Sequence, residues 1–209
     1  GNGPGELYQP TGLDVGPDGT LWVVDRGNGR VQAFRPDGSP LGAYPASRAS
    51  QALALPRQQA AIVESFDERL ATIIDARGQV VRKISAPANE PISGATSRQT
   101  IYLNKPRVAL MRDGALVSAS VNLLKPVVRL IETDSGQVRW TARPWSDAAF
   151  STLVAAAAAR QQEIVKTGGY GGRQIVGSLQ THPLTGEIWL GTGATSILVL
   201  SPVDGRIVQ

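Results

Sequence analysis

Short apolar runs alternate with turn residues along the whole chain, in a pattern that repeats. In residues 30–44, two apolar stretches flank Asp37-Gly38, and this order of strand, tight turn and strand predicts a β-hairpin. The same arrangement returns in 69–84, 127–140 and 197–209, with turn glycines Gly78, Gly136 and Gly205. Glycine at that place supplies the positive φ that such turns need. The chain therefore contains four similar hairpins.

Each hairpin is preceded by a further turn and strand. The turn pairs Asp18-Gly19, Gln58-Gln59, Asp113-Gly114 and Thr185-Gly186 each lead into an apolar run. The second residue of each pair is separated from the next hairpin glycine (Gly38 in the first copy) by 19, 19, 22 and 19 residues. One more apolar run precedes each pair, at 12–15, 52–55, 108–111 and 176–179. The repeating unit is thus four antiparallel strands in about 35–40 residues.

Four-stranded units of this length are typical of the blades of a β-propeller. A β-sandwich is the alternative, because it also has many short strands joined by frequent turns. A sandwich, however, does not predict the same separation between turns four times over. We therefore expect one all-β propeller domain over 1–209, with blades at about 9–44, 50–84, 105–140 and 174–209.

Residues 3–34 resemble an NHL repeat. A proline precedes the first strand, Asp18-Gly19 forms the first turn, and Asp25-x-x-Asn28-x-Arg30 leads into the third strand. The opening Gly-x-Gly-Pro-Gly-Glu at 1–6 is similar to the blade openings of bacterial six-bladed propellers. Later copies keep the strand order but lose most of the signature. The resemblance implies an NHL-type ring of six blades, of which this chain holds four, with the remaining blades missing from it.

Two insertions interrupt the repeat, both between the last strand of one blade and the first strand of the next. The insertion at 85–104 contains Pro87, Asn89, Pro91 and Gly94, and it predicts a loop with one extra strand at 100–103. The insertion at 141–173 contains a run of alanines at 155–159 and apolar residues at helical spacing. We expect one α-helix near 147–166, followed by a glycine-rich loop.

Composition excludes several classes of protein. Hydrophobic residues make up 42% and charged residues 18%, so the chain can form a core and is neither disordered nor a coiled coil. With 0 cysteines, it has no disulfide, zinc-thiolate site or cysteine nucleophile. The sequence contains no apolar stretch long enough to span a membrane. The net charge of +4 comes from cations scattered along the chain, which is typical of a solvated surface.

A ligand is expected on the face formed by the loops between second and third strands and the connections between blades. The helix of the second insertion would cover apolar surface or act as a lid on that face. The candidate contact residues in these loops are Arg26, Phe66, Asn122, Trp145, Tyr170 and Arg173. The ligand, protein or small molecule, is not identified by the sequence. Few aromatic residues accompany the cations, so nucleic acid binding has little support.

Structural roles account for the other conspicuous residues. Asp25, Asn28 and Arg30 suit a turn in which the acid and amide satisfy backbone N–H groups and the arginine pairs with an acid. The turn glycines Gly19, Gly38, Gly78, Gly114, Gly136, Gly186 and Gly205 form the structural motif of the repeat. The one histidine, His182, lies in a turn on the opposite face from the loops, where no catalytic set surrounds it.

The sequence therefore favours a non-enzymatic binding or scaffold module with no catalytic residue, metal ligand or cofactor. A metal-dependent hydrolase or lyase, of the gluconolactonase or streptogramin-lyase type, is the alternative that the resemblance leaves open. Its divalent cation would need acceptors such as Asp14, Asp25, Glu64, Asp67 and Asn122 to converge. The resemblance further implies a periplasmic, lipid-anchored or secreted bacterial protein, although no signal peptide is present in this chain.

Overall fold

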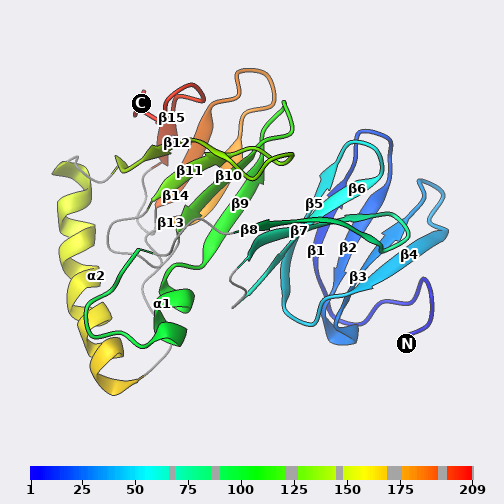
Figure 1. The fold of residues 1–209 in the computed structure, drawn as a ribbon, viewed down its shortest axis with the longest axis horizontal. Coiled ribbons are helices and arrows are strands. Elements are labelled where there is room, and N and C mark those ends of the chain that lie inside the picture. The colour runs from blue at the N-terminus through cyan, green and yellow to red at the C-terminus, as the bar shows by residue number, and fades with distance from the viewer. Residues whose placement is uncertain are drawn as a thin grey trace. The chain divides into compact units, whose positions relative to one another are not determined.

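The computed structural model describes residues 1–65, 69–85, 90–120, 127–144, 148–168, 176–192 and 197–208, except for the side chains of 148–154 and 156. The chain forms two compact units, Gly1–Ala86 and Pro87–Gln209. Each unit contains two antiparallel sheets whose strands follow chain order. The strands are coloured blue to teal in the first unit and green to red in the second (Figure 1).

Both sheets of the first unit have four strands. The first contains β1 (Pro10–Val15), β2 (Leu21–Asp25), β3 (Arg30–Phe34) and β4 (Pro40–Pro45), with the 3₁₀ helix η1 (Arg26–Asn28) between β2 and β3. The second contains β5 (Ala49–Leu55), β6 (Gln59–Glu64), β7 (Arg69–Asp75) and β8 (Val80–Ser85). Successive side chains point to opposite faces of each sheet, and the inner strands β2, β3, β6 and β7 are buried on both faces, whereas β1 and β4 are exposed or half-buried.

Small side chains let the two sheets of the first unit pack closely. Trp22, Val24 and Val31 of the first sheet lie in one buried cluster with residues of the second. The second sheet contributes mainly alanines to this cluster, together with Ile62 and Ile74. Large residues of one sheet facing small residues of the other let the two sheets pack closely.

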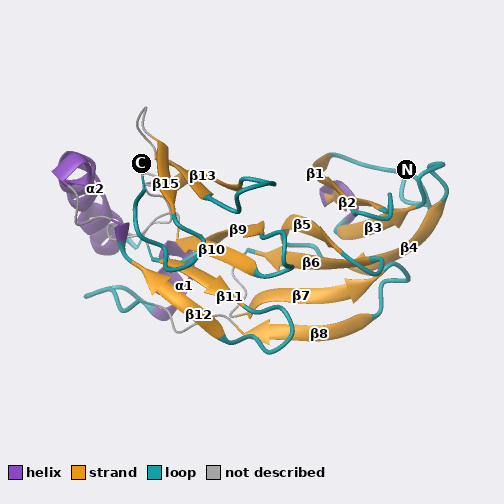
Figure 2. Cartoon of the chain, turned by 90° about the horizontal axis from the view of Figure 1, so that it is seen from above, coloured by secondary structure: helices purple, strands orange, loops and turns teal. Residues whose placement is uncertain are grey.

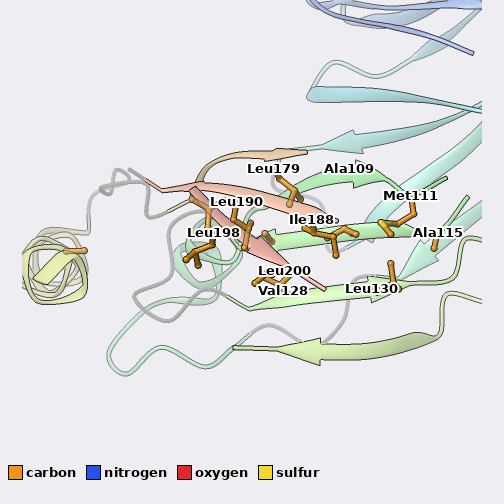
Figure 3. Close-up of a cluster of buried hydrophobic side chains, with 14 residues drawn as sticks. Ala109, Met111, Ala115, Val128, Leu130, Leu179, Ile188, Leu190, Leu198 and Leu200 are labelled. Carbon is orange, nitrogen blue, oxygen red and sulfur yellow. The ribbon is translucent and has the colours of Figure 1, made fainter. Parts of the chain in front are cut away.

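The described residues of the second unit form two sheets and two helices, with strands drawn in orange and helices in purple in Figure 2. Its first sheet is formed by β9 (Pro106–Leu110), β10 (Leu116–Ser120), β11 (Val128–Ile131) and β12 (Val138–Ala142). Its second sheet contains β13 (Val176–Thr181), β14 (Ile188–Thr192) and β15 (Ile197–Leu200). The core lies between them, where Val128 and Leu130 meet Ile188, Leu190 and Leu200 (Figure 3).

The last blade differs from the expected four strands. After β15, the described residues form a bridge between Leu200 and Ile207, and Val208 donates its backbone N–H to Val199. This pairing is too short to count as a strand, so the described sheet has three strands.

The expected helix of the second insertion is confirmed, since α2 covers Ala148–Thr167. The all-β fold of propeller type is confirmed as well, because the described strands form four antiparallel sheets in the expected order along the chain. No described helix has both the length and the apolar character required to cross a membrane.

The expected strand at 100–103 is wrong, because these residues belong to the helix α1 (Ser97–Leu103). Thr96 caps this helix: its side chain accepts from the N–H of Gln99, and the Gln99 side chain accepts from the N–H of Thr96. This capping box satisfies N–H groups that a helix leaves unpaired at its start. The β-branched residues Thr100 and Ile101 favour a strand by propensity, but the cap and the burial of Leu103 decide the local structure.

Glycine is required at the turn between β7 and β8. Gly78 has φ +81°, and a Cβ there would lie 2.2 Å from the carbonyl oxygen of Ala43. A Cβ on Gly42 would likewise lie 2.6 Å from the carbonyl oxygen of Ala76. Strand β4 of the first sheet therefore packs directly on this turn of the second sheet, backbone against backbone.

Candidate functional site

The Asp25 carboxylate is the centre of the loop end of the first sheet. It closes β2, is fully buried, and accepts four hydrogen bonds. The backbone N–H of Tyr8 donates to Oδ1 at 2.7 Å. Asn28 Nδ2, Arg30 Nε and Gln32 Nε2 donate to Oδ2 at 2.8, 2.9 and 3.1 Å. Burial raises the pKa of Asp25, but the hydrogen bonds from Tyr8, Asn28 and Arg30 outweigh burial and hold this pKa below its usual value.

Arg30 extends this network to the segment that precedes β1. Its Nη1 donates to the carbonyl of Asn2 at 2.8 Å, and its Nη2 donates to the carbonyls of Gly3 and Glu6 at 2.8 and 2.9 Å. Gln32 also binds this segment, since it donates to the Glu6 carbonyl at 2.8 Å. The Asp25-x-x-Asn28-x-Arg30 signature thus clamps the chain before β1 onto the sheet.

Arg26 stands beside this clamp with an exposed side chain. It begins η1, which ends at Gly29 with φ +64°. Gly27 donates its N–H to the Tyr8 carbonyl at 2.8 Å, and a Cβ on Gly27 would lie 2.5 Å from that same oxygen. The loop that presents Arg26 is therefore held on both sides by main-chain and side-chain bonds.

The structure places only one of the six candidate contact residues. Arg26 is described, whereas Phe66, Asn122, Trp145, Tyr170 and Arg173 lie outside the described residues. Whether these six side chains come together therefore stays a prediction.

His182 acts as a turn cap in the described structure. Its Nδ1 accepts from the backbone N–H of Thr185 at 3.1 Å and from that of Leu184 at 3.4 Å. Its ring lies against Trp189, with 5.6 Å between ring centroids. Through these contacts the His182 ring stabilises the β13–β14 turn.

The oxygen acceptors considered for a metal have other partners where they are described. Asp14 accepts from the N–H of Val15 at 2.9 Å and from that of Ala54 at 2.8 Å. Asp25 is enclosed by its four donors, and Asp67 and Asn122 lie outside the described residues. Within the part of the chain that the structure describes, no group of three or more His, Cys, Asp or Glu side chains is placed to hold a metal ion.

A charged cluster in the second unit joins Glu90 of the first insertion to Arg129 of β11 and to Arg143, which follows β12. Oε1 of Glu90 accepts from Arg129 Nη2 at 3.0 Å and from Arg143 Nη2 at 2.9 Å. Asn104 fixes the backbone of Glu90 through bonds of 2.9 and 3.0 Å. Burial lowers the pKa of Arg129, and the charge of Arg143 adds to that effect. Sequence reasoning missed Arg129, because one arginine inside a strand gives no motif.

A cavity of about 470 Å³ lies in the first unit at the opposite end from Arg26. The turns of both sheets line it, with Asp18, Thr20, Arg35, Pro36, Leu41, Gln58, Ala76 and Arg77. Sequence reasoning missed these residues because they belong to different turns, 59 positions apart at most. The scattered arginines of these turns predicted only a solvated surface.

Comparison with known proteins agrees with this geometry. Residues 7–34 match the family model of the NHL repeat. Among curated proteins, none matches the sequence. A catalytically inactive variant of virginiamycin B lyase from Staphylococcus aureus, solved with quinupristin, is similar in structure: TM-score 0.58 and 15% identity over 95% of this chain and 54% of that one.

Two further solved structures are similar. One is a protein of unknown function from Bacteroides caccae, with TM-score 0.57 and 11% identity over 95% of this chain and 65% of that one. The other is the Swd1 β-propeller domain from Myceliophteria thermophila, with TM-score 0.57 and 12% identity over 88% and 49%. The chain thus spans about half to two thirds of these structures. At such identities the likeness shows the β-propeller fold alone.

Proposed function

We propose that this NHL-type propeller chain is a non-enzymatic binding module whose ligand contacts the loop end of the blades, Arg26 included. One observation carries the proposal. The polar side chains at the loop end of the first sheet form hydrogen bonds that fix the backbone around Asp25. The Arg26 side chain, by contrast, is exposed on this ordered loop. A loop that is already ordered loses little conformational entropy when a ligand binds.

The test is capture of binding partners by the immobilised protein. We expect Arg26→Ala to release at least one partner that the unchanged protein retains. Arg112→Ala is the matched control, because Arg112 is an exposed arginine in the β9–β10 turn. Partners that all bind equally to both variants would remove Arg26 from the binding face.

The metal-dependent hydrolase or lyase is the competing proposal. The likeness to virginiamycin B lyase supports its fold. Two of the acids considered for its metal are already engaged, Asp14 by backbone N–H groups and Asp25 by Arg30 among its donors. Calorimetric titration with calcium, magnesium and zinc separates the two proposals. Stoichiometric binding of one ion, with hydrolysis or elimination activity that depends on that ion, would contradict the binding-module proposal and support the enzyme.

The place of action is part of the same proposal. The similarity of residues 1–6 to bacterial propeller openings supports a protein that works outside the cytoplasm of a bacterium. Fractionation of cells that make the protein tests this: we expect it in the periplasm, at the envelope or in the medium. Recovery with the cytoplasmic fraction alone would contradict it.

A further inference from the structure

We propose that the cavity at the turn end of the first unit is a second binding site, which takes a small organic molecule bearing one carboxylate or phosphate group. Arg35 and Arg77 would hold the oxyanion. The cavity of about 470 Å³ is within the volume range of small-molecule sites. It is open to solvent, since most of the residues that line it are exposed. It lies at the opposite end from Arg26, so it is independent of the proposed partner-binding face.

The arginines that line the cavity keep donors for a ligand. Arg35 donates through Nη1 to the neutral Ser39 hydroxyl at 3.1 Å. The other N–H groups of its guanidinium can donate to a ligand. The Arg77 side chain makes no hydrogen bond or ion pair with the described residues. Two guanidinium groups on one small cavity suit an oxyanion, since each can donate two parallel N–H bonds to it.

The nearby carboxylates accept backbone N–H bonds. Among them is Asp37, which interacts electrostatically with Arg35 and accepts from the N–H of Ser39 at 2.9 Å. Asp18 accepts from the N–H groups of Thr20 and Gln58 at 3.0 and 3.1 Å. Asp75 accepts from the N–H groups of Arg77 and Gln79, both at 2.9 Å. These backbone donors stabilise the ionised carboxylates and occupy part of their acceptor sites. Neither Asp18 nor Asp75 is bonded to a guanidinium within the described part of the chain, where Asp18 is the one acid that lines the cavity.

Backbone packing fixes the wall that carries Arg77. Gly42 and Gly78 allow β4 to touch the β7–β8 turn, so the Arg77 backbone cannot move without breaking that contact. A fixed backbone limits the positions that the Arg77 side chain can take, so less conformational entropy is lost when a ligand binds.

Strain in the adjacent turn is a second sign of a built site. Arg57 and Gln58 have φ of +63° and +52°, a region that non-glycine residues adopt at a cost of about 1–3 kcal/mol each. Most other turns of the chain carry glycine at such positions. The strained turn places the Gln58 side chain on the cavity and its N–H on Asp18. Strain of this kind gathers at ligand sites.

The remaining wall combines apolar and neutral polar side chains, which would contact the body of the ligand. Pro36, Leu41 and Ala76 line it, while Thr20 and Gln58 add neutral polar groups. The expected ligand thus has an oxyanion on one side and a compact apolar body on the other.

Calorimetric titration of the full chain with benzoate, inorganic phosphate and uncharged benzamide tests the proposal. We expect benzoate to bind and benzamide to leave no measurable heat. Arg35→Gln and Arg77→Gln should each weaken benzoate binding about tenfold, because each removes a charged hydrogen-bond pair. Arg112→Gln, at an equivalent turn outside the cavity, should change nothing, and Asp18→Asn should strengthen binding by removing a like charge.

The two sources of oxyanion are told apart by the same titrations. Binding of phosphate with the same arginine dependence would assign an inorganic anion or phosphate ester, and binding of benzoate alone would assign a carboxylate with an apolar body. Either result supports the site. No binding of either anion, or equal binding by the Arg77→Gln and Arg112→Gln variants, overturns it. If Arg77→Gln fails to fold by circular dichroism, Arg77→Lys keeps the charge without the paired donors, and unchanged benzoate affinity there contradicts the proposal.

Discussion

Arg30 donates from Nε to Oδ2 of the buried Asp25 at 2.9 Å, and with its two Nη atoms it holds three carbonyl groups of the segment before β1. The Arg30 guanidinium therefore links the end of β2 to a segment that no strand pairing holds. Its side chain is 17% exposed and that of Asp25 is 0% exposed, so the pair lies at the boundary of the core. The pair acts as a structural clamp.

Asp25→Ala should lower the free energy of unfolding by about 3 kcal/mol, because it leaves the donors of Arg30, Asn28 and Gln32 without their acceptor in a buried place. Urea unfolding followed by tryptophan fluorescence measures the loss. Asp37→Ala is the control, since Asp37 is an exposed turn residue bonded to Ser39. Equal losses for the two variants would show that Asp25 has no special role.

Most of the fold follows from local sequence rules. Turn pairs such as Asp18-Gly19 lie between apolar runs, so hairpins and their spacing could be predicted without the structure. The helix α1 was missed, although Thr96-x-x-Gln99 is a capping-box pattern that could have revealed it.

The candidate sites follow from the sequence much less well. The clamp residues could be named because Asp25, Asn28 and Arg30 are close in the chain. The cavity could not, because Arg35 and Arg77 come from turns of two different sheets. Contacts between distant segments depend on packing, which local patterns do not encode.

Stability should fall in acid. The pKa of Asp25 is lower in the folded chain than its usual value of 3.8, so the unfolded chain takes up its proton first as the pH drops. The stabilisation by Asp25 is complete above the unfolded value and is lost as the pH falls through the folded pKa. Asp18, Asp37, Asp113 and Asp204 have pKa values shifted in the same direction.

Unfolding midpoints measured from pH 6 to pH 2.5 test this expectation. Each carboxyl of this kind adds at most about 1.4 kcal/mol per pH unit to the slope. Asp25→Asn should be less stable at pH 6 but should lose less stability on acidification than the unchanged chain. A variant with the same slope as the unchanged chain would mean that Asp25 does not contribute to the acid sensitivity.

Loss of the α1 cap should weaken the second unit. Thr96→Ala removes the acceptor for the Gln99 N–H and should cost about 1 kcal/mol. Thr96→Ser keeps the oxygen and should cost much less. Gln99→Leu should cost more than Thr96→Ala, because buried Gln99 also donates to the Ile164 carbonyl of α2 at 3.2 Å. Thermal unfolding followed by circular dichroism ranks the stability losses of the three variants. A larger loss for Thr96→Ala than for Gln99→Leu would mean that the cap matters more than the bond to α2.

Two turn glycines with nearly the same φ separate backbone strain from crowding. Gly38 and Gly78 have φ of +84° and +81°, so alanine suffers the same conformational penalty of about 1–2 kcal/mol at either position. A Cβ on Gly38 meets nothing within 4 Å, whereas a Cβ on Gly78 would lie 2.2 Å from the Ala43 carbonyl oxygen. Gly78→Ala must therefore also push β4 away from the turn, and it should cost about 3 kcal/mol or more in all.

Urea unfolding of the two variants measures the difference directly. Because the same movement would displace Arg77, Gly78→Ala should also weaken benzoate binding, while Gly38→Ala should leave that binding unchanged. Equal losses of stability in the two variants would mean that β4 and the β7–β8 turn do not touch in solution. The rigid cavity wall would then have no support, because close packing of these two backbones is what holds Arg77 in place.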